Sequence, residues 1–358
     1  MSQDLSPRDY SLTGENGQTG YDLSDWYITP VDRKRLKSLM KRSDAPALKN
    51  YGLWLGCILF FGALLVATWG SWWALPVAIL YGVFYGSGGD SRWHENSHGT
   101  VFRTRWLNDF FYQLASFMSL RNPYVWRWSH TRHHTETVVV GRDPEIAFPR
   151  PPSIWMWLLN LVYIPSILGE LKKMVRIAFN QLSDAEKSYT PQIDRPKAIW
   201  ASRIQLAILV GIVVLSLSMQ SWLPLMLIGL PTFYGSWLHH LMASTQHAGL
   251  AEDVPDHRLN SRTVLMNPFF RFIYSNMNYH IEHHMFPNVP FYALPALHEE
   301  IKHDCPPPYP SLWAAYREIV PTVIRQQRDY SHFANRPLPE GAGNTPDTKR
   351  HPMAVAAE

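Results

Sequence analysis

The chain has 358 residues, a formal net charge of +4 and 46% hydrophobic residues. Charged residues make up 17% of the chain, fewer than the roughly 25% of ordinary soluble domains. This composition argues against a pair of soluble domains, and the modest charge does not suggest a nucleic-acid partner. The two cysteines, Cys57 and Cys305, provide neither a disulfide framework nor a C-x-x-C motif.

Residues 1–50 are predicted to form an N-terminal arm. Positions 1–30 are rich in Gly, Ser, Asp and Thr and show no periodicity, which predicts flexibility. Positions 32–50 are rich in Lys and Arg and directly precede an apolar block, so we expect them at the headgroups of a membrane. A cleavable signal peptide is not expected, because the first apolar run follows about fifty polar residues.

Two blocks, 51–89 and 204–238, contain no charged residue. Each is long enough for two membrane-spanning helices joined by a turn. The predicted spans lie near 51–69, 72–89, 204–219 and 222–240. A buried hairpin of a soluble protein is the alternative, but helices that are apolar on every side are rare outside lipid.

Three clusters of histidine follow helical spacing. The motif HENSH has an i, i+4 pair, and HTRHH and HIEHH each have an i, i+3, i+4 set. Such positions share one face of a helix, so their imidazoles can converge. A single exposed pair is usually incidental, but three clusters in one chain predict a metal site. The clustered residues are His94, His98, His130, His133, His134, His280, His283 and His284.

The apolar piece between the hairpins, near 153–175, is predicted to be an interfacial helix. It contains Asn160 and Pro165 and continues into a basic amphipathic stretch. A membrane crossing here would place HTRHH and HIEHH on opposite sides of the membrane, where they could not share a site. We therefore expect it to lie in the headgroup plane, with the histidines and both termini on the cytoplasmic side.

The predicted fold is an all-α integral membrane protein with four transmembrane helices in two hairpins and a cytoplasmic helical cap. The cap carries the histidine-rich di-metal site. The membrane domain is expected to cover 51–330, and the Pro-, Gly- and Ala-rich tail, 331–358, is expected to be disordered.

Eight clustered histidines are too many for one zinc ion. They suit two first-row metals with open coordination positions, and imidazole binds iron, copper or zinc alike. Haem fits poorly, because bis-histidine ligation needs only two rings.

The order of the three motifs, with long apolar segments before the first and between the second and third, resembles the membrane-bound fatty-acid desaturase and hydroxylase superfamily. The resemblance covers about 45–330. The stretch HENSHGTVFRTRWLND and the phrase GRDPEI are most similar to a bacterial subgroup of desaturases and hydrocarbon oxygenases. The resemblance implies two iron ions that activate O2, no catalytic residue beyond the metal ligands, and a place in a bacterial inner membrane.

The resemblance also implies a ninth histidine ligand before the third motif. The candidates are His239, His240 and His247. We choose His247, because Q-H-A-G-L at 246–250 resembles the E-H-Y-G-L of membrane alkane hydroxylases. His240 is the second choice, and His239 is interpreted as structural. Two further interpretations concern residues outside the ligand set. Several polar residues near the motifs could orient the ligand rings, or could instead be helix caps or surface charges. They are Asp90, Glu95, Asp143, Glu145, Glu282, Asn276 and Asn278. Three other histidines are interpreted as surface residues: His257, His298 and His303.

The predicted function is an O2-dependent desaturase of a fatty-acyl or lipid chain. The first alternative is a hydroxylase or monooxygenase that acts on a hydrocarbon or a smaller metabolite. A membrane metal transporter or sensor is the alternative from another class, weakened because the histidines flank the spans rather than lie at their midplane. The chain has no Cys-rich iron–sulfur run and no H-P-G-G segment like that of fused cytochrome b5 domains. The expected electron donor is therefore a separate ferredoxin, rubredoxin or cytochrome. Arg103, Arg105, Arg127 and Arg132 could bind it or could contact headgroups.

Overall fold

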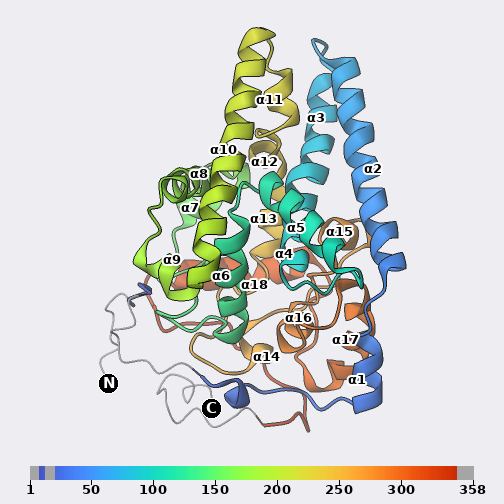
Figure 1. Cartoon of the computed structure of the whole chain (residues 1–358). Coiled ribbons are helices and arrows are strands. Elements are labelled where there is room, and N and C mark those ends of the chain that lie inside the picture. Colours follow the sequence, from blue (N-terminus) through green and yellow to red (C-terminus); the bar gives the residue numbers. More distant parts are fainter. Residues whose placement is uncertain (1–7, 13–20, 345–358) are drawn as a thin grey trace.

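The computed structural model describes residues 8–12 and 21–344. Within these ranges the regular structure is helical, and extended pairing is confined to two isolated bridges, Thr263 with Tyr279 and Val264 with Tyr309. Figure 1 shows two helical hairpins that project in the same direction from a broader layer of shorter helices. The all-α prediction is confirmed for the described residues.

The first hairpin consists of α2 (Asp44–Thr68) and α3 (Ala74–Gly82). Its turn uses Gly70, whose φ of +84° is in the region that glycine favours, and the adjoining Trp72 is 92% exposed. Beyond α3 the helix continues through a π-helical turn, η2 (Val83–Ser87), into α4 (Gly88–Ser97). The expected span near 72–89 is therefore continuous with the helix that carries the first histidine motif.

The second hairpin begins with α10 (Arg195–Ser218), but its returning arm is broken. The arm consists of α11 (Leu223–Leu227), α12 (Pro231–Gly235) and α13 (Trp237–Ala243). A continuous helix near 222–240 was expected, and this expectation is wrong. Pro231 cannot donate a helical hydrogen bond, and Gly229 before it has a φ of +96°.

Two helical stretches in the described ranges are long and apolar enough to cross a membrane, Arg33–Thr68 and Gln192–Ser218. A third crossing is possible only if the two arms of one bent pair count together, Ile154–Val162 with Ile164–Ala178. Of the four expected spans, the first span of each hairpin, near 51–69 and near 204–219, therefore lies in a helix that is long and apolar enough by itself.

The bent pair stands where a single interfacial helix was expected. It comprises α7 (Ile154–Leu159), the 3-10 turn η3 (Asn160–Val162) and α8 (Ile164–Ala178), and its arms meet at 80°. Tyr163 at the bend has a φ of +55°, and Pro165 follows in the first turn of α8. The left-handed residue interrupts the helix, and proline is favoured only at the start of the next one.

The hairpins touch through their backbones at a crossing of small residues. A Cβ added to Gly235 of α12 would lie 1.9 Å from the carbonyl oxygen of Gly82 at the end of α3. One turn later, the hydroxyl of Ser87 donates to the Gly235 carbonyl at 2.6 Å and accepts from the backbone N–H of His239 at 2.9 Å. Small residues allow this approach, as they do at helix crossings in membranes.

The remaining helices form the layer below the hairpins in Figure 1. Asn122 caps α6, accepting hydrogen bonds from the N–H groups of Tyr124 and Val125, and Pro123 occupies its first turn. These helices are α1 (Arg33–Leu39), α5 (Arg105–Met118), α6 (Pro123–Thr135), α9 (Asp184–Tyr189), α14 (His257–Asn260), α15 (Pro268–Ile273), α16 (His280–Met285), α17 (Leu294–Ile301) and α18 (Leu312–Arg325).

Both terminal segments are tied to this layer by one buried carboxylate, which we call the Asp304 clamp. Asp304 accepts hydrogen bonds from Tyr27 at 2.7 Å, Thr29 at 2.6 Å and the N–H of Gly343 at 2.7 Å. Arg258, whose side chain is fully buried, pairs with it at 3.0 Å. Residues 21–32, which we call the N-terminal strap, are therefore held against the body although flexibility was expected.

The tail, expected to be disordered from residue 331, is ordered over 331–344. The Ala334 N–H donates to the Gly249 carbonyl at 2.8 Å, and the Arg336 guanidinium lies over the Tyr309 ring at 4.2 Å. These contacts use backbone groups and a cation–π pair that composition does not reveal. Residues 1–7, 13–20 and 345–358 of the two expected segments lie outside the described residues.

Candidate metal centre

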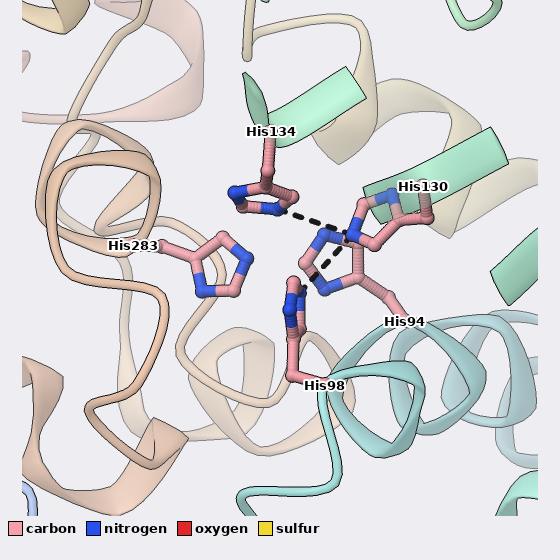
Figure 2. A group of neighbouring side chains, drawn as sticks. All are labelled: His94, His98, His130, His134 and His283. Atoms are coloured by element: carbon pink, nitrogen blue, oxygen red, sulfur yellow. Dashed lines mark hydrogen bonds between the residues drawn. The ribbon is translucent and has the colours of Figure 1, made fainter. Parts of the chain in front are cut away.

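The nine histidines proposed as ligands lie together in two adjacent groups. Within each group the ring nitrogens that could bind a metal all lie within 4.8 Å of one another. Figure 2 shows that the rings of the first group turn toward a common point. The five-histidine group is His94, His98, His130, His134 and His283, and the four-histidine group is His133, His247, His280 and His284.

The three motifs divide unevenly between the two groups. Both histidines of the first motif come from the end of α4 and enter the five-histidine group. On α6, His133 and His134 are neighbours in sequence but belong to different groups, and His283 and His284 on α16 divide in the same way. The groups are therefore adjacent, and the His134 and His284 rings stack at 4.1 Å between centroids.

The nitrogens in each group are close enough for a shared ion. Nε2 of His130 lies 3.1 Å from Nε2 of His98 and 3.2 Å from that of His134, as the dashed lines in Figure 2 mark. In the other group, Nε2 of His280 lies 2.9 Å from that of His247 and 3.0 Å from that of His284.

His247 completes the four-histidine group from a turn rather than from a helix. It follows α13, and the chain turns away at Gly249, which has a φ of +74°. Its Nδ1 lies 2.8 Å from the carbonyl oxygen of Asn260, which leaves Nε2 directed at the group. The two competing candidates lie elsewhere: His239 is 3.3 Å from Asp90, and Nε2 of His240 is 3.0 Å from the Trp157 carbonyl.

Carboxylates and a hydroxyl contact the far nitrogens of several rings. Nδ1 of His94 lies 3.2 Å from Glu95, that of His130 2.9 Å from Glu145, and that of His133 2.8 Å from Asp143. These contacts fix the ring orientations, as outer partners of metal-bound histidines commonly do. The hydroxyl of Thr137, 3.1 Å from Nδ1 of His284, and the Asn260 carbonyl have the same role and were not anticipated.

Other polar residues that were singled out near the motifs serve other contacts. Asp90 pairs with Arg121 at 2.5 Å, and Glu282 bonds His298 and accepts from Thr263 at 2.6 Å. Asn276 and Asn278 donate to backbone carbonyls of Phe291 and Val264.

Two of the histidines expected at the surface are buried. His257 is 4% exposed and His298 is 7% exposed, whereas His303 is exposed as expected. The expectation failed because α14 and α17 are short, so few neighbouring residues reveal which face is covered.

Burial and mutual repulsion keep most of these rings neutral. Loss of solvent, with the neighbouring imidazoles, lowers the pKa of His94, His280 and His284 well below the usual value. Burial opposes the charged form of His133 too, but the Asp143 carboxylate outweighs it and raises the pKa of His133. A neutral imidazole presents a lone pair, so the set suits metal binding.

The nitrogens that lack partners also fit metal ions. In the described part of the chain, both ring nitrogens of His283 and Nδ1 of His280 are buried without a hydrogen-bond partner. Leaving such groups unpaired costs free energy, about 1–3 kcal/mol each. Metal ions would bind rings in this state, and a nitrogen-only donor set suits first-row transition metals.

A cavity of about 620 Å³ reaches both groups. Its lining includes His94, His130, His133, His247 and His280, together with Met156 and Trp157 of α7 and Asn160 of η3. The cavity thus joins both histidine groups to residues of the bent helix pair.

The fold and the site together define a class of protein: a helical membrane protein whose buried histidines can hold two metal ions. Comparison with known proteins gives the family. A family model described as fatty acid desaturase matches residues 70–316, and the chain belongs to this family. It is therefore an oxidoreductase of lipid metabolism, and the resemblance seen in the histidine motifs is confirmed.

Three curated relatives are named as desaturases. The chain is 25% identical over 293 residues to an omega-6 fatty acid desaturase of the endoplasmic reticulum from Glycine max, covering 71% of this chain and 72% of the relative. It is 24% identical over 295 residues to a Delta(12)-acyl-lipid-desaturase from Punica granatum, covering 72% and 74%. An acyl-lipid (9+3)-(E)-desaturase from Dimorphotheca sinuata is 25% identical over 294 residues, covering 71% and 73%.

Proposed function

We propose that this protein is an O2-dependent desaturase that introduces a double bond into a fatty-acyl or lipid chain. The observation that carries the proposal is the pair of adjacent histidine groups, with five of the nine rings lining one cavity. Membership of the family and the names of the relatives support an acyl chain as the substrate.

We infer one iron ion per group, bound by the five and the four histidines. The ions would supply O2 activation, because the C–H bonds of an alkyl chain are beyond acid–base chemistry. The overall reaction balances when the chain loses two hydrogen atoms, a donor supplies two electrons and the solvent two protons. O2 then leaves as two molecules of water.

The protein residues hold and shield this centre. Asp143, Glu145 and Glu95 fix the rings of His133, His130 and His94 through the nitrogens that face away from the groups. Met156 and Trp157 of α7 line the same cavity as the histidines, where they can fix the position of an apolar chain. Positioning of this kind selects which carbon atoms face the centre.

We further infer that the hairpins lie in a bacterial inner membrane, with the histidine layer and both termini on the cytoplasmic side. Exposed basic residues of α1, including Arg33, Lys34 and Lys37, support this orientation. Arg103 and Arg105 are exposed beside Trp106, which fits contact with headgroups. The donor is a separate ferredoxin, rubredoxin or cytochrome.

A hydroxylase is the second candidate, favoured by one feature of the cavity. Its wall includes Asp90, Arg121, Tyr163 and His239, which contact one another. A substrate with a polar group could bind here with one carbon facing the centre. Trapping of one oxygen atom at that carbon would give an alcohol instead of an alkene.

The test is product analysis with a panel of acyl lipids and hydrocarbons, an electron donor and O2. Loss of two hydrogen atoms in the product mass spectrum supports the desaturase, and gain of one oxygen atom supports the hydroxylase. Substrate-independent metal transport without O2 consumption would contradict both and support a transporter or sensor.

The matched variants are His133→Ala and His303→Ala. The first removes a ring from the four-histidine group and is expected to abolish turnover, while membrane insertion persists because the hairpins fold on their own apolar length. The second changes an exposed histidine and is expected to be silent. Full turnover by His133→Ala would overturn the di-iron assignment.

A further inference from the structure

A column of stacked rings connects the N-terminal strap with the four-histidine group. Trp26 of the strap stacks on His257 of α14, with 4.4 Å between ring centroids and 13° between planes. His257 in turn packs on His284, at 5.2 Å and 41°. Tyr21 meets the outer side of Trp26 edge-on at 5.9 Å.

The two middle rings are held by packing more than by polar contacts. Trp26 is 8% exposed and His257 is 4% exposed. In the described residues, Nε1 of Trp26 and Nδ1 of His257 have no hydrogen-bond partner, although both are buried. The stability cost of two unpaired donors or acceptors needs an explanation, and the position of the rings suggests one.

The column lies at the end of the molecule away from the hairpins. In Figure 1, α14 and the blue strap are at the bottom of the layer, opposite the projecting hairpins. The strap also exposes apolar side chains there, with Leu23 73% and Ile28 53% exposed. A water-soluble protein can reach this face while the hairpins are in a membrane.

We propose that electrons enter the centre through this column. The inference rests on the proposed function, and it deepens that function by assigning the donor's face. A reduced one-electron carrier protein of the iron–sulfur or haem class binds over Leu23 and Ile28. It is oxidised by one electron, which crosses Trp26 and His257 to His284, and a second encounter supplies the second electron. With O2, two protons and two hydrogen atoms from the substrate, these two electrons complete the formation of two waters.

The physical reason is that electron tunnelling weakens steeply with distance through a protein. Rings in van der Waals contact shorten the gaps, and the column leaves no large gap between the strap and a histidine of the group. His257 is not a member of either group, so its role is to position and connect His284.

A second chain of rings exists but faces a different environment. Trp126 meets Trp93 at 5.6 Å, and Trp93 meets His130 at 5.8 Å. Both tryptophans line the cavity, and Trp126 is covered by α8, donating to Glu170 at 2.7 Å. A carrier protein is excluded from that side by the bent helix pair.

The experiment injects electrons at the strap. A ruthenium photosensitiser is attached to the cysteine of a Leu23→Cys variant of the full-length, iron-loaded protein. Reduction of the iron after a light flash is followed anaerobically by absorbance and electron paramagnetic resonance. Trp26→Leu and His257→Leu are compared with the conservative Trp26→Phe and with Trp126→Leu as the matched control. Dithionite, which is small enough to use the cavity, serves as a second reductant, and the iron content of every variant is measured.

We expect Trp26→Leu and His257→Leu to lose most of the rate of light-driven reduction, because leucine removes a ring from the column and widens the gap to His284. Trp26→Phe should retain most of the rate, and Trp126→Leu all of it. Iron content should not change in any variant, and reduction by dithionite should not change in the variants of Trp26 and His257.

Equal light-driven rates in all variants would overturn the proposal, as would a larger effect of Trp126→Leu. A parallel loss of the dithionite rate or of iron would show a merely structural role for the column. If the parent protein binds no iron that dithionite reduces, the proposed function fails as well, so the two failures are distinguishable.

Discussion

His247 is the residue at which the ligand assignment can be tested most sharply. Replacing it with Gln keeps a side chain able to donate to the Asn260 carbonyl, which now lies 2.8 Å from Nδ1, but removes the nitrogen that faces His280. Sites with four protein ligands bind zinc with about 10–16 kcal/mol, or about 2.5–4 kcal/mol per ligand if the ligands contribute equally. The affinity of the four-histidine group for its metal should therefore fall roughly 10²–10³-fold.

The assay is metal content after dialysis against a graded series of chelator concentrations. His247→Gln should retain the ion of the five-histidine group and lose the other, with loss of turnover. The control is His239→Gln, whose ring contacts Asp90 and Ser91 and belongs to neither group. It should lose at most about 1 kcal/mol of stability and no metal. Equal metal retention by both variants would refute the assignment of His247.

Two further predictions concern the clamp and the orientation. Arg258→Met leaves Asp256 and Asp304 without their buried partner, which should lower the free energy of unfolding by about 3–5 kcal/mol. The unfolding temperature in detergent should therefore fall, and the strap should become accessible to protease. An unchanged unfolding temperature would contradict the clamp. Single cysteines that replace Gly70 or Gln220 should react with an impermeant thiol reagent in intact cells. A cysteine that replaces Gly141 should react only after the membrane is permeabilised. Labelling at Gly141 in intact cells would mean that the orientation is the reverse of the one proposed.

The grouping of the histidines could be anticipated in part because their spacing is local. Three and four residues along a helix bring side chains onto one face regardless of the rest of the fold, so α6 and α16 each present three rings as predicted. Which group each ring joins was not predictable. The division of His133 from His134, and of His283 from His284, depends on how the helices pack against each other.

The misjudged elements depend on contacts between distant parts of the chain. The apolar block near 222–240 satisfied the length of a span, yet its prolines and Gly229 break it into short helices that pack on the first hairpin. The strap was expected to be flexible from its composition, but Tyr27 and Thr29 bond a carboxylate about 275 positions away, Asp304. His257 was assigned to the surface because nothing nearby in sequence indicates that Trp26 covers it.

The glycine crossing between the hairpins limits how this protein could be engineered. A Cβ at Gly235 would collide with the backbone of Gly82, and a Cβ at Gly82 would lie 2.5 Å from the Tyr234 ring and 3.0 Å from Cα of Gly235, so a larger residue at either position would disturb the contact between the hairpins. Ser87 bonds both the Gly235 carbonyl and the N–H of His239, so a displacement at the crossing would change the position of α13 directly. Attempts to enlarge or reshape the space for a different substrate should leave this contact unaltered. They should begin at Met156 of α7, which lines the cavity away from this crossing, whereas Trp157 beside it is tied to the second hairpin through His240 and Ser244.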